Sequence, residues 1–170
     1  ATVTLTVAPA NDAPEAANDI GTTPEDLPIS GDVLLNDTDK EGTALTVTQF
    51  VVDGDATTYA AGNTATITNV GTIVINTDGT YTFTPAPNYH GPVPTVTYTN
   101  SDGSLSDTAT LDITVTPVED LPVATDDSYT TAEDVPYTGD LGSNDTQSGD
   151  GGNVWSVSYT HLRAHETKAN

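Results

Sequence analysis

Residues 72–84 read TIVINTDGTYTFT, and apolar and polar side chains alternate on both sides of the central Asn76-Thr77-Asp78-Gly79. An alternation with a period of two lets one face of a β-strand be buried while the other face meets water. Gly79 supplies the positive φ that a tight turn between two strands requires. The stretch therefore predicts a β-hairpin.

The same alternation is found outward from this hairpin, at 45–47, 96–99 and 111–115, and Ser101-Asp102-Gly103 supplies a second turn of the same type. No stretch shows convincing helical periodicity, and the 33 Thr residues, with many Val and Ile, favour strands. Seven or more short strands per unit predict an all-β fold, an immunoglobulin-like (cadherin-like) sandwich of two sheets.

An internal repeat sets the predicted domain organisation. Glu25-Asp26-Leu27-Pro28 and Asn36-Asp37-Thr38 return as Glu133-Asp134-Val135-Pro136 and Asn144-Asp145-Thr146, each 108 positions later and without a gap. The chain is therefore predicted to be a window of a tandem array. It comprises the last strand of a preceding repeat (1–10), a complete repeat (11–118), the start of a truncated repeat (119–155) and a tail (156–170).

The tail differs from the rest of the chain. It reads SVSYTHLRAHETKAN, drops the alternation of Thr with Val, and holds two of the three basic residues. Residues 157–167 resemble the translation of a sequencing adapter, so we interpret 156–170 as not biological and as no part of the fold.

The acidic charge of the chain excludes several partners. It carries 25 Asp and Glu residues against 3 Lys and Arg, a net charge of −22. Nucleic acids and anionic membrane surfaces both require basic patches, so neither is an expected partner. No apolar run is long enough to cross a bilayer, so we expect no direct membrane insertion.

Cysteine is absent from the chain, so disulfides cannot stiffen it. Abundant carboxylates with almost no counter-charge make a divalent cation, above all Ca²⁺, the natural substitute. The alternative is that the acids only keep the protein soluble and its edge strands apart.

One loop carries part of a calcium-binding pattern. In Asp37-x-Asp39-x-Glu41-Gly42, oxygen ligands fall at alternate positions and a Gly provides the sharp turn at the sixth position. The Glu expected at the twelfth position is missing, because residue 48 is Thr. Asp-rich loops are also common turns without metal, since Asp and Asn bond their own backbone.

Acidic residues also recur around the two predicted unit junctions, where Pro in each linker restricts the backbone. Carboxylates at a junction are well placed to hold a cation between neighbouring repeats of the same chain. The candidate metal ligands are Asn11, Asp12, Asp19, Glu25, Asp26, Asp37, Asp39, Glu41, Glu119, Asp120, Asp127, Glu133 and Asp134.

The ordered series NDAPEAANDIGTTPEDLPI, VLLNDTDKEGTALTV, GTIVINTDGTYTFTPAPNYHG and VTYTNSDGSLSDTATLDITVTP resembles the tandem cadherin-like repeats of bacterial surface proteins. VCBS repeats, tandem-95 repeats and RTX adhesin extender domains are of this type. The resemblance covers residues 1–155. It implies an immunoglobulin-like sandwich, calcium near the domain junctions with Asn11, Asp12, Glu119 and Asp120 as ligands, type I secretion to the cell surface, and a spacer role in a large adhesin.

Two other classes of function stay open at this point. A sandwich of this kind could bind a carbohydrate or a protein, although the complete repeat offers few aromatic residues beyond Tyr59 and Tyr89 for a sugar platform. Cell-surface glycans or proteins are also conceivable partners of other domains of a longer parent. An enzyme is poorly supported, because there is no Cys, one His outside the tail, and no nucleophile motif.

Overall fold

The computed structural model describes residues 2–6, 10–132, 138–140 and 142–149. The chain divides into two units, Ala1–Val118 and Glu119–Asn170. The strands found over the described residues all lie in the first unit: β1 (Asp19–Pro24), β2 (Ile29–Asp32), β3 (Thr46–Val52), β4 (Thr58–Ala60), β5 (Thr64–Ile67), β6 (Gly71–Ile75), β7 (Thr80–Pro85), β8 (Gly91–Pro92), β9 (Val96–Ser101) and β10 (Ser106–Thr116).

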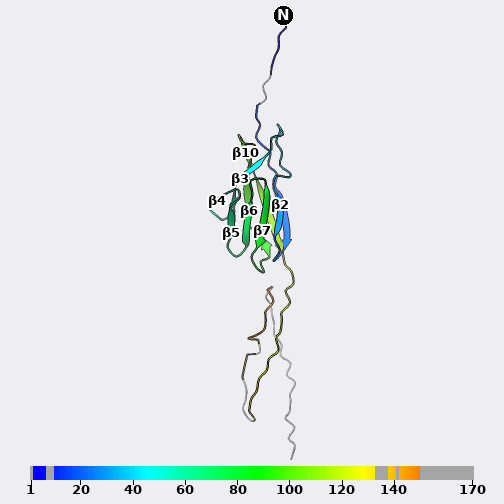
Figure 1. Cartoon of the computed structure of the whole chain (residues 1–170), viewed down its shortest axis with the longest axis vertical. Coiled ribbons are helices and arrows are strands. Elements are labelled where there is room, and N and C mark those ends of the chain that lie inside the picture. The colour runs from blue at the N-terminus through cyan, green and yellow to red at the C-terminus, as the bar shows by residue number, and fades with distance from the viewer. Residues whose placement is uncertain (1, 7–9, 133–137, 141, 150–170) are drawn as a thin grey trace, which may run out of the picture. The chain divides into compact units, whose positions relative to one another are not determined.

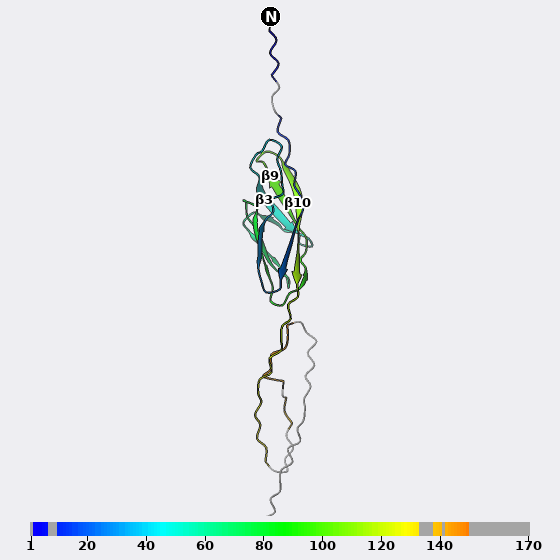
Figure 2. The same cartoon turned by 90° about the vertical axis from the view of Figure 1, so that its right-hand side faces the viewer.

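These strands form two packed sheets (Figure 1). One sheet has the order β1-β10-β9-β3-β4, with β8 pairing to β10, and the other has the order β2-β7-β6-β5. Figure 2 shows β3, β9 and β10 side by side in the first sheet. The predicted all-β sandwich is confirmed.

The predicted hairpin is formed by β6 and β7, which pair Ile73 with Phe83 and Ile75 with Tyr81. Ile73, Ile75 and Phe83 are completely buried between the sheets. Gly79 in the turn has a φ of 86°, which side chains disfavour, and its amide donates to the carbonyl of Asn76 at 3.0 Å. The alternating pattern therefore identified both the strands and the buried face.

The core lies between the sheets and consists mainly of the apolar members of the alternating strands. Phe50, Val96, Leu111, Ile113 and Val115 are at most 2% exposed. Tyr89 closes one end of the sandwich, because its hydroxyl donates to the carbonyl of Pro92. A tyrosine hydroxyl bonded to nearby backbone is a feature of corners in immunoglobulin-like sandwiches.

The first strand pairs in parallel with the last. Asp19 lies opposite Leu111 and Pro24 lies opposite Thr116, so β1 and β10 run in the same direction. The Asp19 end of the unit is therefore where the chain enters, and the other end is where β10 leaves it (Figure 2). We call these the entry end and the exit end.

A close backbone contact makes Gly71 hard to replace. Its φ is 152°, and an added Cβ would lie 2.3 Å from the carbonyl oxygen of Thr84 on β7. We expect Gly71→Ala to lower the free energy of unfolding by about 2 kcal/mol, because the backbone of the β6–β7 pair must shift. Urea titration measures the loss.

Gly54→Ala is the matched control, because Gly54 also has a positive φ, +80°, but nothing lies within 4 Å of an added Cβ. Its cost is expected to be about 1 kcal/mol, the conformational penalty alone. Equal losses in the two variants would contradict the steric argument.

The predicted last strand of a preceding repeat is not a strand over residues 2–6, where Val3 and Leu5 are 91% and 87% exposed. A strand needs a neighbouring strand to satisfy its backbone, and no described residue pairs with this segment. Its assignment to a preceding repeat stays a prediction. The predicted tail, 156–170, lies outside the described residues, as do 133–137, 141 and 150–155 of the predicted truncated repeat.

Candidate metal centre

The acidic residues of the first unit gather at its two ends. The entry end comprises the linker 11–18, the loop 33–43 and the turn between β9 and β10. The exit end comprises residues 25–28, the segment 86–92 and the end of β10. The predicted ligands that precede position 43 are divided between these ends, because β1 carries the chain from one to the other.

At the entry end, carboxylates hold the linker by accepting its N–H groups. The side-chain amide of Asn11 donates to Asp102 at 2.6 Å. The backbone amide of Ala16 donates to Asp107 at 3.0 Å, and that of Ala17 donates to Asp37 at 2.8 Å. These carboxylates come from the loop 33–43 and from the β9–β10 hairpin, so they join the linker to both.

Tyr98 and Asn100 of β9 are completely buried beneath this linker. The amide of Asn100 donates to Asp37 at 2.7 Å. The hydroxyl of Tyr98 lies 3.1 Å from a carboxylate oxygen of Asp19 and 3.2 Å from one of Asp37, and 2.9 Å from the carbonyl of Val33. Asp19 and Asp37 are therefore brought together around one phenol.

The burial of this cluster shifts its protonation. Burial, with the negative charges of Asp37 and Asp19, raises the pKa of Tyr98, so its hydroxyl keeps its proton. Burial also raises the pKa of Asp19, although the hydrogen bond from Tyr98 opposes that rise. A protonated phenol is a donor, which explains why two carboxylates can face it.

The outer rim of the entry end holds Asp12, Asp39 and Glu41. The ammonium of Lys40 contacts Asp12, and the backbone amide of Asp12 donates to Glu41 at 3.1 Å. Asp39 lines a cavity of about 370 Å³ with Asp12 and Glu15. One oxygen of Asp39 accepts the amide of Thr43 at 2.8 Å, and the other is buried without a hydrogen-bond partner.

At the exit end, Glu25 is 3% exposed. One of its carboxylate oxygens accepts the amide of Val118, while the other accepts no hydrogen bond and lies 3.8 Å from Nδ1 of His90. Asp26, its neighbour, is exposed and has a φ of 61°. Its carboxylate accepts the amide of Asn88 at 2.9 Å.

The second unit repeats part of the entry end. The amide of Thr125 donates to Asp145 at 2.8 Å, as the amide of Ala17 does to Asp37, and a bridge between Val123 and Thr146 matches that between Glu15 and Thr38. The corresponding positions are 108 residues apart. Of the predicted ligands here, Glu119 and Asp127 are exposed and Asp120 is half-buried, and Glu133 and Asp134 lie outside the described residues.

The alternate positions of the predicted calcium loop point in different directions. Asp37 turns inward to Asn100, whereas Glu41 turns outward to the backbone of Asp12. Within the part of the chain that the structure describes, no three His, Cys, Asp or Glu side chains are grouped as a metal site. Each end nevertheless contains one buried carboxylate oxygen without a hydrogen-bond partner, on Asp39 and on Glu25.

Sequence reasoning missed Tyr98, Asn100, Asp102 and Asp107 as parts of the entry end. One signal was available: in Val96-x-Tyr98-x-Asn100 an amide occupies an inward position of an alternating strand. A buried amide needs partners, and the acidic loops were the available acceptors. Asp102 and Asp107 carried no such signal, because turns commonly contain exposed Asp.

Residues 11–117 match the bacterial cadherin-like domain. The chain belongs to this family. No curated protein matches the sequence significantly. Bacterial cadherin-like domains are typically extracellular, and over its described residues this one contains no helix with the length and apolarity that a membrane crossing requires.

Solved structures similar to this cadherin-like domain protein include an endo-fucoidan hydrolase of glycoside hydrolase family 107, at 22% identity and a TM-score of 0.38 over 66% of this chain and 15% of that chain. A SusE-like surface polysaccharide-binding protein of the Bacteroides thetaiotaomicron heparin utilisation locus has 18% identity and a TM-score of 0.37 over 65% of this chain and 17% of that chain. The four N-terminal Ig domains of Dscam1 have 14% identity and a TM-score of 0.37 over 67% and 28%. The chain spans less than a third of the length of each of these structures.

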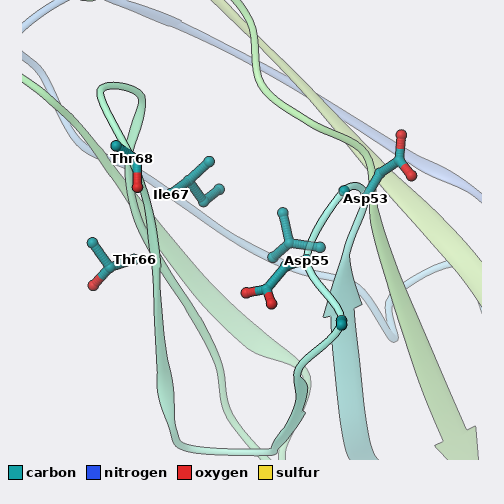
Figure 3. A pocket seen from close by; sticks show the side chains of 8 residues that line it. Asp53, Asp55, Thr66, Ile67 and Thr68 are labelled. Atoms are coloured by element: carbon teal, nitrogen blue, oxygen red, sulfur yellow. The ribbon is translucent and has the colours of Figure 1, made fainter.

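A further groove of about 300 Å³ lies away from the entry end of the cadherin-like sandwich, between the turn after β3 and the end of β5. Asp53 and Asp55 lie on one side of it and Thr66 and Thr68 on the other (Figure 3). Asp55 accepts the hydroxyl of Tyr59 at 2.8 Å, and this bond holds the pKa of Asp55 below its usual range. The groove is therefore polar, and Asp55 stays ionised at neutral pH.

The hydrogen bonds at the entry end predict an acid limit to stability. The amide of Ala16 lowers the pKa of Asp107 from its ordinary value of 3.8, and the amide of Leu105, with Asn11, lowers that of Asp102. The contribution of each carboxylate to the free energy of unfolding is complete above pH 3.8, and it is lost as the pH falls through the folded-state pKa. Asp19 has the opposite sign, since its raised pKa favours folding until the pH rises through that value.

Denaturant midpoints measured from pH 6 down to about pH 2 are therefore expected to fall below about pH 4. Asp107→Asn is expected to flatten this fall. Asp112→Asn controls for net charge, because Asp112 is an exposed carboxylate on β10 that accepts the hydroxyl of Thr95 and contacts no part of the linker. If the denaturant midpoint falls equally below pH 4 in Asp107→Asn and in the parent chain, the hydrogen bond of Asp107 is not a cause of the fall.

Proposed function

We propose that this cadherin-like chain is a calcium-stiffened structural spacer of a large secreted bacterial surface adhesin. Its repeats are of the VCBS type, it reaches the cell surface by type I secretion, and neighbouring repeats of the same chain are its main partners. Family membership supports an extracellular sandwich module. The observation that carries the calcium proposal is the buried carboxylate oxygen of Glu25 that accepts no hydrogen bond, with Nδ1 of His90 3.8 Å away.

The side chains at both ends supply oxygen atoms, the type of donor that calcium prefers. Ca²⁺ prefers oxygen ligands, mainly carboxylates and carbonyls, in flexible numbers. At the exit end of the first unit Glu25 and Asp26 would hold it, and Glu119 and Asp120 of the second unit are candidate ligands from the sequence alone. At the entry end Asp12, Asp39 and Glu41 would hold it. A buried carboxylate oxygen that accepts no hydrogen bond is costly, and a cation beside it lowers that cost.

Charge explains what the cation would do for the array. The chain has a net charge of −22, so its clustered carboxylates repel one another. Ca²⁺ neutralises the clusters and, by binding only the folded state, stabilises it by mass action. A stiffened array keeps the adhesive part of its parent away from the cell surface.

Calorimetric titration of Ca²⁺ into the full chain, after chelator treatment, tests the proposal. We expect saturable binding that Glu25→Gln weakens at least tenfold at one site, because the substitution keeps the shape and removes the charge. Asp112→Asn, which removes an exposed charge in the middle of β10, is expected to bind as the parent does. Absence of binding in the parent chain would reject calcium while leaving the fold intact.

The second candidate function is a carbohydrate- or protein-binding module, and the polar groove beside β5 is the observation that favours it. The aromatic ring best placed for a sugar is already engaged: Tyr59 stacks on Phe50 with 5.3 Å between ring centroids. Binding of residues 11–118 to a glycan array, lost in Asp53→Asn, would favour this function over the spacer.

A further inference from the structure

The geometry points to Asp37 as a latch residue, which fastens the chain entering the sandwich by protein hydrogen bonds alone. The inference deepens the proposed spacer function and rests on it, because it concerns how the linker of a spacer is stiffened. Under this inference the two ends of the sandwich are stabilised differently. Protein N–H groups fix the linker at the entry end, and Ca²⁺ acts only at the outer rim of that end and at the exit end.

Both oxygens of Asp37 are occupied by N–H donors of the protein. One accepts the amide of Ala17 at 2.8 Å, and the other accepts the side-chain amide of Asn100 at 2.7 Å. The hydroxyl of Tyr98 lies 3.2 and 3.3 Å from the two oxygens. Asp37 therefore connects the linker to two completely buried residues of β9.

Neighbouring contacts close the latch from both sides. Glu15 and Thr38 form a two-way backbone bridge, with N–O distances of 2.8 and 3.0 Å. The side-chain amide of Asn36 donates to the carbonyls of Ala17 and Asn18 at 3.4 and 3.2 Å. The segment Asn36-Asp37-Thr38 thus contacts the second half of the linker, at Glu15, Ala17 and Asn18.

The linker half of this arrangement recurs in the second unit, where Asp145 accepts the amide of Thr125 at 2.8 Å and Thr146 bridges to Val123. The described residues of that unit contain no strand of their own. The contact therefore depends on the local sequence Asn-Asp-Thr and its linker, and not on a completed core. We infer one such contact for each repeat, made by the Asp of the Asn-Asp-Thr motif.

Amide hydrogen exchange on the full chain in EDTA tests the latch. The amides of Ala17 and Thr125 are expected to be protected without calcium. In Asp37→Asn, one orientation turns a side-chain NH₂ toward Asn100 and the other turns it toward Ala17, so a donor always meets a donor. Exchange at Ala17 is expected to accelerate at least tenfold, while Thr125 and the amides of β7 stay unchanged.

Asp145→Ala is the control in the second unit, because it removes the carboxylate that accepts the amide of Thr125: we expect faster exchange at Thr125 and no change at Ala17. It also keeps the test decisive if Asp37→Asn fails to fold. Protection of Ala17 that develops only when Ca²⁺ is added would overturn the inference, as would equal exchange at Ala17 in the parent and in Asp37→Asn. Failure of Ca²⁺ to bind would reject the proposed function but would leave the exchange result standing.

Discussion

Adding Ca²⁺ to the chelator-treated chain is expected to raise the melting temperature of the sandwich by roughly 15 °C. A ligand that binds only the folded state contributes about 4 kcal/mol when its free concentration is a thousand times the dissociation constant. For a domain of this size, each kcal/mol corresponds to about 4 °C. The physical source is the relief of carboxylate repulsion at the two ends and the pairing of the buried oxygens of Glu25 and Asp39.

Scanning calorimetry with a calcium series measures this shift, and Glu25→Gln separates site binding from general charge screening. In EDTA the variant is expected to melt no lower than the parent, because the amide oxygen can still accept from Val118 and the buried carboxylate oxygen without a hydrogen bond is gone. In Ca²⁺ its gain is expected to be at most half that of the parent. An equal rise in melting temperature with Ca²⁺ in both proteins would show that Glu25 is not a ligand. A melting temperature of the parent that does not change with Ca²⁺ would reject the calcium proposal.

Removal of one hydroxyl group from the core is expected to have the second-largest effect. Tyr98→Phe should lower the free energy of unfolding by roughly 3 kcal/mol, the upper part of the range for leaving buried acceptors unsatisfied. Tyr98 is completely buried, and its hydroxyl is the donor that faces both Asp19 and Asp37. Without it, two carboxylates face each other across the cavity of the missing oxygen.

Urea unfolding measures this loss, with an unchanged dependence on denaturant if the variant keeps the same fold. Tyr59→Phe is the matched control, since its hydroxyl also donates to a carboxylate, that of Asp55, but at a position where the residue is only half-buried. Its loss is expected to be below about 1 kcal/mol. Equal losses in the two variants would show that the hydroxyl of Tyr98 contributes no more to the free energy of unfolding than that of Tyr59.

The hairpin, the alternating strands and the all-β class could be predicted from the sequence because each depends on residues near one another in the chain. Alternation selects the buried face of β6, β7, β9 and β10 without knowledge of any partner. Gly79 marks its own turn. The entry-end contacts of Asp37 and Asp145 also follow local sequence, since they recur 108 residues apart.

The candidate site could be predicted only as a set of residue types. The acidic residues were predicted as a set of related positions, and their role as ligands stays a prediction. Their division between two ends of the sandwich was not predicted. That division depends on β1 pairing in parallel with β10, a contact between residues such as Asp19 and Leu111 that lie far apart in sequence. No periodicity in either strand encodes its partner or its direction.

The sequence by itself therefore determined the strands, their buried faces, the turns and the repeated acidic motifs, because hydrophobic period and backbone stereochemistry act within a few residues. Only the tertiary structure decided which carboxylates are satisfied by protein donors, as Asp37 is by Asn100, and which retain an unpartnered oxygen, as Glu25 does. The physical reason is that hydrogen bonding and desolvation depend on distance in space, and the packing of the two sheets sets that distance.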